Sequence, residues 1–142
     1  HNRVVHARQK FADEKVHVEM FEGSSDACMN WFIPHNGVGH DTIFFLDAHW
    51  NDYCPLLEEL EAINRYDLHP VIAIHDFKEP TGRLGYDSYN GHDFCFDYIK
   101  PKLDAIYRAK TLTQKFGYSY YYNHPSRATG AMRGIIYILP NR

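Results

Sequence analysis

The 142-residue sequence has little cysteine, no long apolar run and no large excess of charge. Its 3 cysteines are odd in number and form no CxxC pair, which argues against a zinc knuckle or a disulfide framework and favours a reducing, cytoplasmic compartment. No stretch approaches the roughly 20 apolar residues of a membrane span, and no signal peptide is visible. A formal net charge of −3 argues against broad attraction to nucleic acid or anionic membrane.

Several common catalytic signatures are also missing from the sequence. It contains no GxSxG, HExxH, Walker A, EF-hand or GxGxxG pattern, so the usual forms of those sites are excluded. It has no internal repeat and no interdomain linker, and 44% of its residues are hydrophobic, which suffices for one core. We therefore expect a single α/β domain over residues 1–142. The chain starts at His1 and not at Met, which is compatible with a processed product and also with a fragment whose domain begins further upstream.

Two apolar runs that end in polar residues organise the sequence. Residues 43–46 are the kind of continuous apolar run seen in a parallel strand covered on both faces, and Asp47, His49 and Trp50 follow. Residues 71–74 form a second such run, which ends in His75 and Asp76. Ligands of open α/β sheets sit just beyond the carboxyl ends of the strands. We therefore expect the chemistry of this protein at these two strand ends.

The remaining patterns predict a Rossmann-like, mostly parallel sheet that closes with an antiparallel hairpin. An amphipathic helix over residues 51–65 connects the two apolar strands in a βαβ unit, with Asp52 as its cap and Pro55 in its first turn. A loop over residues 78–91 would lie beside the strand ends. Further helices are predicted over residues 1–14, 26–31 (capped by Ser25 or Asp26) and 93–110, and further strands over residues 16–21, 117–122 and 132–139.

Asp47 and Asp76 are the candidate metal ligands. Adjacent strands lie about 4.8 Å apart, so two carboxylates at neighbouring strand ends can share a divalent cation such as Mg²⁺. His49 and His75 can add nitrogen ligands or act as a base. The simpler alternative is that each Asp caps the helix after its strand, but the same Asp and His arrangement occurs twice, which favours a functional pair.

Two other features have a structural as well as a functional interpretation. Trp50 is either a platform for a ligand ring or a core aromatic at a strand–helix junction, and the sequence favours neither. Gly23, Ser24 and Ser25 can present backbone N–H groups to a ligand, although by themselves they are more typical of a plain strand-to-helix turn.

Residues 45–53 resemble the strand-four segment of the catechol O-methyltransferase-like enzymes, where Leu-Asp-His-Trp is followed by Lys and a Tyr. Residues 20–26 (Met-Phe-Glu-Gly-Ser-Ser-Asp) are similar to that family's Gly-Ala-Ser stretch after strand three. Residues 74–77 (Ile-His-Asp-Phe) stand where the family has an Asp-Asn pair after strand five, with Phe77 at the position of the Asn. The Tyr-rich closing hairpin resembles the family's strands six and seven. The resemblance therefore runs from about Val16 to Leu139, and it is best for class I S-adenosylmethionine-dependent methyltransferases in general. The family's first strands and their Gly-rich turn have no counterpart in these residues.

The resemblance implies a function and a set of roles. The chain would transfer a methyl group from S-adenosylmethionine to a hydroxyl of a small molecule or sugar, with Mg²⁺ held by Asp47 and Asp76. Ser25 and Trp50 would contact the adenine, and His49 the adenosine. The catalytic residues would be Asp47 and His75, since Asn51 stands near the position of the family's catalytic Lys. The residues that would bind the cofactor are Gly23, Ser24, Ser25, Asp47, His49 and Trp50.

Two other functions remain open at this stage. The first is a metal-dependent hydrolase that uses Asp47, His49, His75 and Asp76 around a divalent ion. The second is a non-catalytic, methyltransferase-like module. The expected partner is a small-molecule acceptor, and a second copy, an N-terminal segment or a second chain would complete the site.

Overall fold

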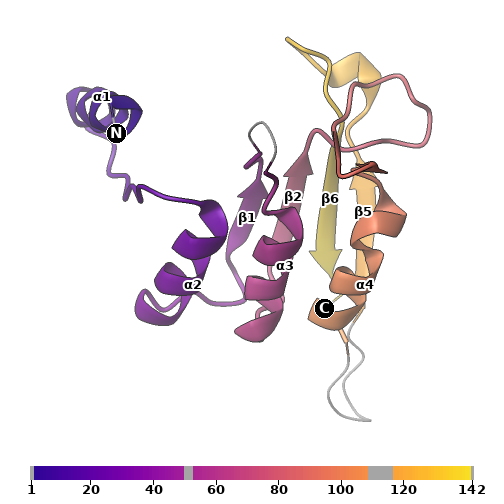
Figure 1. The fold of residues 1–142 in the computed structure, drawn as a ribbon, viewed down its shortest axis with the longest axis horizontal. Coiled ribbons are helices and arrows are strands. Elements are labelled where there is room, and N and C mark those ends of the chain that lie inside the picture. Colours follow the sequence, from indigo (N-terminus) through magenta and orange to yellow (C-terminus); the bar gives the residue numbers. More distant parts are fainter. Residues whose placement is uncertain (1, 50–52, 109–116, 142) are drawn as a thin grey trace.

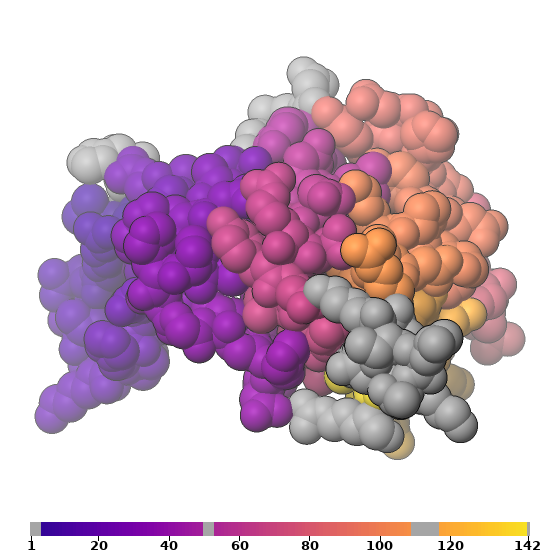
Figure 2. Space-filling model, turned by 90° about the horizontal axis from the view of Figure 1, so that it is seen from below, coloured from indigo at the N-terminus to yellow at the C-terminus, as the bar shows by residue number. Residues whose placement is uncertain are grey.

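A computed structural model describes residues 2–49, 53–108 and 117–141 of the chain. The elements follow one another as α1 (Asn2–Asp13), α2 (Ser25–His35), β1 (Ile43–Leu46), α3 (Leu56–Arg65), β2 (Val71–His75), β3 (Ser88–Tyr89), β4 (His92–Asp93), α4 (Phe96–Ile106), β5 (Tyr118–Tyr122), the 3₁₀ turn η1 (Pro125–Arg127) and β6 (Ile135–Pro140). Seen from below, the N-terminal segment forms one end of the molecule and the segments after β2 form the other (Figure 2).

Four strands form one mixed sheet in the order β1-β2-β6-β5. β1 and β2 are parallel, and β6 is antiparallel to both β2 and β5. Three strands therefore run in one direction, with the reversed β6 between two of them. The predicted βαβ unit is present as β1-α3-β2, and the predicted C-terminal hairpin is present as β5-β6. The α/β class is confirmed, although only one of the three strand pairings is parallel.

Helices α2, α3 and α4 lie side by side on one face of the sheet (Figure 1). The apolar stripes expected on the helices face this sheet, and Leu60, Ile63, Ile99 and Leu103 are fully buried in it. Each such side chain contributes about 1.5–3 kcal/mol of transfer free energy. The core therefore lies between the helices and the sheet.

The opposite face of the sheet is open. Ile43 and Phe45 of β1 are 69% and 59% exposed, and Tyr121 of β5 is 55% exposed. The expectation that β1 is covered on both faces is therefore wrong. Within the described residues the helices that pack on the sheet all lie on the other side, so alternate side chains of β1 face solvent.

The predicted strand over residues 16–21 is absent, although its apolar and polar residues alternate. Helix α1 ends at Asp13, Lys15 takes a left-handed conformation, and the chain then leaves α1 in an extended form. This extended segment leads to α2 with α1 standing away from the sheet (Figure 1), and none of the strands in the described part of the chain pairs with it. Alternation alone does not make a strand, because a strand needs a hydrogen-bonding neighbour.

Other boundaries differ from the prediction for local reasons. α2 continues to His35 and follows Ser24 as its N-cap position, so neither Ser25 nor Asp26 is the cap. α3 begins only after Pro55, while Asp52 lies outside the described residues. α4 begins later than expected because Asp93 belongs to the small β3-β4 ribbon.

The last strand begins at Ile135 instead of Met132. Met132 has a left-handed backbone (φ 54°), and Arg133 forms a parallel bridge with Gly85, so this stretch pairs with the loop after β2 before it enters the sheet. Among the described residues, no helix combines the length and the apolar character needed to cross a bilayer.

Gly134 should be intolerant of a side chain. A Cβ atom built there would lie 2.0 Å from the Phe77 carbonyl oxygen, and the Phe77 N–H donates to the Gly134 carbonyl at 2.9 Å. We expect Gly134→Ala to lower the free energy of unfolding by about 2 kcal/mol or more, as overpacking does. Urea unfolding measures this loss.

Gly39→Ala is the matched control, because a Cβ there meets nothing within 4 Å. Its unfolding midpoint should stay within about 0.5 kcal/mol of the parent. Equal losses in the two variants would contradict the close approach at Gly134.

Candidate functional site

The parallel pairing of β1 and β2 brings the two strand ends together. Leu46 lies opposite Ile74 in the register, so Asp47 and His75 are the next residues along the two strands. The His75 Nδ1 atom lies 2.9 Å from the Asp47 Oδ1 atom. The sequence prediction that these side chains meet at one edge of the sheet is confirmed.

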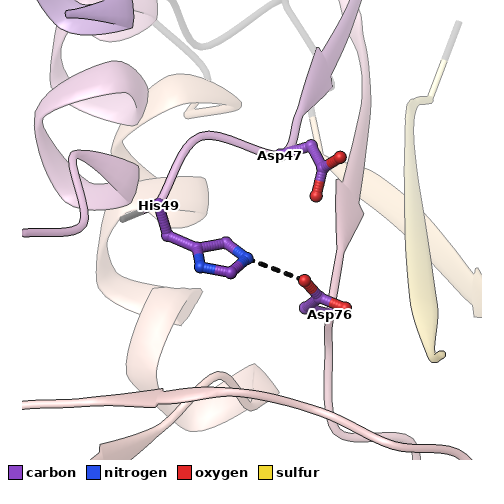
Figure 3. A group of neighbouring side chains, drawn as sticks. All are labelled: Asp47, His49 and Asp76. Atoms are coloured by element: carbon purple, nitrogen blue, oxygen red, sulfur yellow. Dashed lines mark hydrogen bonds and ion pairs between the residues drawn. The ribbon is translucent and has the colours of Figure 1, made fainter. Parts of the chain in front are cut away.

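His49 joins this group from the segment after β1. Its Nε2 atom lies 2.8 Å from Asp76 Oδ2, and Figure 3 shows the imidazole directed toward that carboxylate. The same nitrogen lies 3.2 Å from Asp87 Oδ2. One ligand atom each from Asp47, His49 and Asp76 can be chosen so that all lie within 4.8 Å of one another, close enough to hold a metal ion.

The backbone turn at Asp76 holds its carboxylate in place. Asp76 has a left-handed conformation (φ 55°), which Asp and Asn adopt more readily than most residues with a Cβ. Its carbonyl accepts a hydrogen bond from the Asp87 N–H at 2.9 Å, and the next residue, Phe77, donates to Gly134. The loop after β2 and the start of β6 thus fix the direction of this side chain.

Arg133 binds two of the carboxylates. Its Nε atom donates to Asp76 Oδ1 and its Nη2 atom donates to Asp87 Oδ1. Burial by itself raises the pKa of Asp76, but the hydrogen bonds from Arg133 and His49 outweigh it and hold that pKa below the ordinary value. The pairing with Asp76 correspondingly raises the pKa of Arg133.

The charges of the site favour a dication. Asp47, Asp76 and Asp87 supply three negative charges, and Arg133 supplies one positive charge. Two negative charges remain uncompensated when both imidazoles are neutral. A divalent cation would neutralise them, and carboxylate oxygens together with imidazole nitrogen are ligands that such ions accept.

Glu59 is a buried acid beside the site. It lies on α3, is 2% exposed, and lines a small cavity together with Asp47, His49 and Cys54. Burial raises its pKa from 4.5 to about 7, although the nearby Ser25 hydroxyl acts in the other direction. A carboxyl group in this environment is protonated below neutral pH.

The residues predicted to hold the cofactor are only partly gathered at the site. Gly23 and Ser24 precede α2, whose N-terminus lies at the same edge of the sheet as the ends of β1 and β2 (Figure 1). The Ser25 hydroxyl, however, is buried and lies beside the Glu59 carboxyl group. Trp50 lies outside the described residues.

The sequence prediction missed Asp87, Arg133 and Glu59 as members of the site. Asp87 lies in the loop that was expected to flank the strand ends, so its position in the sequence could have identified it as a candidate site residue. Arg133 precedes the last strand, and its place follows only from the insertion of β6 beside β2. Glu59 looked like an ordinary acid of a helix first turn.

No protein-family model, curated protein or solved structure matches this chain. What the site does therefore has to follow from its own geometry and from the motif resemblance described above. The geometric evidence is the group formed by Asp47, His49, His75 and Asp76.

Glu59→Gln should stabilise the protein at alkaline pH. Because the folded pKa of Glu59 is about 7 and the unfolded value about 4.5, the folded state binds the extra proton between these values and stability falls as the pH rises through them. Gln removes this loss, so urea unfolding at pH 8 should show a gain of about 2–3 kcal/mol, which vanishes below about pH 4.5. The exposed Glu58→Gln on the same helix should show no such pH-dependent gain, and an equal gain in both variants would contradict the burial of Glu59.

Arg133→Gln should raise the pKa of Asp76. The substitution removes the guanidinium that offsets the burial of this carboxyl group. A carboxyl-carbon NMR titration should show the Asp76 pKa above that of the parent, because burial is then no longer offset by the guanidinium. The exposed Arg83→Gln in the neighbouring loop should leave the Asp76 titration where it is; an unchanged Asp76 pKa in Arg133→Gln would show that the ion pair does not control it.

Proposed function

We propose that this chain holds a divalent cation at Asp47, His49 and Asp76 and uses it in S-adenosylmethionine-dependent O-methylation of a small molecule or sugar. The observation that carries the proposal is the convergence of these three side chains at the carboxyl edge of two parallel strands. Together with Asp87 and Arg133, they form a site with two uncompensated negative charges.

The ligand spacing suits a metal ion. Neighbouring ligands of an octahedral ion, each at about 2.1 Å, lie about 3 Å apart. His49 Nε2 and Asp76 Oδ2 are 2.8 Å apart, so the pair needs little movement to share an ion. Mg²⁺ fits two carboxylates with water in its other positions, and the imidazole nitrogen also suits Mn²⁺.

The arrangement of elements supports the methyl-transfer part of the proposal. The motif resemblance calls for two strands joined by a helix, each ending in a site acid, followed by a closing hairpin. β1-α3-β2 and β5-β6 have this form. The turn with Gly23 and Ser24 enters α2 at the same edge, where its backbone N–H groups can meet a cofactor. We propose a Rossmann-like fold together with this function.

His75 is the residue best placed to accept a proton. With Nδ1–H donating to Asp47, the imidazole is held in one orientation. Its Nε2 atom has no hydrogen-bonding partner among the described residues, and the ring lines an open groove. His75 can therefore take the proton of an acceptor hydroxyl while Asp47 stabilises the imidazolium. A bound cation would lower the pKa of that hydroxyl.

A metal-dependent hydrolase is the second candidate function. Its support is the presence of two imidazole–carboxylate pairs, His49 with Asp76 at 2.8 Å and His75 with Asp47 at 2.9 Å. A water molecule near such a pair can be activated by the imidazole as base. Cofactor binding separates the two candidates.

Titration calorimetry with Mn²⁺ and with Mg²⁺ tests the cation site. Asp76→Asn removes a charge from the centre of the group, so we expect it to weaken binding by roughly tenfold or more. Asp104→Asn is the matched control, because Asp104 is an exposed acid paired with Lys100 on α4, and it should bind as the parent does. Equal binding by parent and Asp76→Asn would contradict the proposed site.

A second titration, with S-adenosylmethionine in the presence of Mg²⁺, tests the methyltransferase part. Cofactor binding that weakens in His49→Ala supports it. Cation binding without cofactor binding would favour the hydrolase, to be assayed on p-nitrophenyl esters with His75→Ala as the inactive variant. Binding of neither would leave a non-catalytic module.

A further inference from the structure

A groove of about 820 Å³ opens next to the proposed cation site. It lies over the ends of β2, β5 and β6, and the loop between β5 and β6 forms one of its walls. Its size falls within the range of small-molecule sites, roughly 300–1,000 Å³. His75 and Arg133 line the groove and also contact the carboxylates of the site, so a ligand bound there would lie beside Asp47 and Asp76.

The wall is a built feature of the hairpin. Residues 123–134 connect β5 to β6, whereas hairpin loops usually have about 2–5 residues. Asn123 closes the base of this loop: its Oδ1 accepts from the Ile135 N–H at 2.7 Å, and its Nδ2 donates to the Arg133 carbonyl at 3.0 Å. A long loop anchored in this way is typical of a binding segment.

The floor of the groove is aromatic. Tyr121 and Tyr137 face each other across β5 and β6, and their rings stack with centroids 4.8 Å apart and planes 18° apart. Tyr121 is 55% exposed, so part of this pair is free for another ring. Offset stacking of a third ring is worth about 0.5–1.5 kcal/mol beyond the area that it buries.

The charges of the lining are of one sign. The groove is lined by Arg127, Arg133, His75 and His124, and no carboxylate is among its lining residues. Arg133 is already paired with Asp76 and Asp87, whereas Arg127 forms no ion pair with any described residue. A guanidinium in a groove without acids binds phosphate or carboxylate well, because its planar N–H groups match two oxygens at once.

We propose that this groove binds a small ring compound that carries a phosphate or carboxylate group, with the ring on Tyr121 and Tyr137 and the anion on Arg127. The inference that this ligand is the methyl acceptor rests on the proposed function. The binding site itself is inferred from the groove alone, and it needs neither cation nor cofactor.

Phenyl phosphate is the first probe, measured by ligand-observed NMR with the full chain at physiological salt and with EDTA present. We expect it to bind about tenfold more tightly than phenol or inorganic phosphate, because each of these lacks one half of the recognised chemistry. Benzoate in place of phenyl phosphate shows whether the site prefers a carboxylate. Binding of phenyl phosphate no tighter than inorganic phosphate would overturn the proposal.

Arg127→Gln should weaken phenyl phosphate binding by about tenfold and leave phenol unchanged, whereas Tyr121→Ser should weaken both. Arg108→Gln makes the same charge change at an exposed position outside the groove and should have no effect. Equal losses in Arg127→Gln and Arg108→Gln would indicate general charge attraction and contradict the site. The phenyl phosphate titration contains EDTA and no cofactor, whereas the calorimetry measures cation binding, so failure of the cation site and failure of the groove give different results.

Discussion

The ion pair between Arg133 and Asp76 connects three otherwise separate parts of this protein. Asp76 ends β2, Arg133 precedes β6, and the same guanidinium also binds Asp87 in the loop between them. Because Asp76 is buried, its negative charge would be costly without this partner. The pair keeps the carboxylate ionised and aimed at His49, and the close approach of Gly134 to Phe77 gives the guanidinium its position.

This arrangement also separates the two proposed binding regions. On one side of the Asp76 turn, Asp47 and His49 complete a group with an excess of negative charge, which favours a cation. On the other side, Arg127, Tyr121 and Tyr137 line a groove whose lining contains no acid, which favours an anion. His75 borders both regions, because its ring lines the groove and its Nδ1 atom lies 2.9 Å from Asp47 Oδ1.

The open face of the sheet is the clearest difference between the fold and the sequence prediction. Ile43 and Phe45 project from β1 on the side opposite the helices, although the apolar run that contains them is typical of a strand covered twice. The same face, farther along at β5 and β6, forms the aromatic floor of the groove. The sheet thus contributes a core on one face and a ligand surface on part of the other.

Local patterns in the sequence determined the helices α1 and α3, the strands β1 and β2, and the convergence of Asp47, His49, His75 and Asp76, because apolar periodicity and the parallel βαβ rule depend on short stretches of chain. They did not determine whether residues 16–21 form a strand, since alternation of apolar and polar residues cannot show whether a neighbouring strand is available for pairing. Only the tertiary structure placed β6 between β2 and β5, and with it brought Arg133 to Asp76. Burial decided the rest: Glu59 looks like any first-turn acid until packing against the site removes it from water and raises its pKa to about 7.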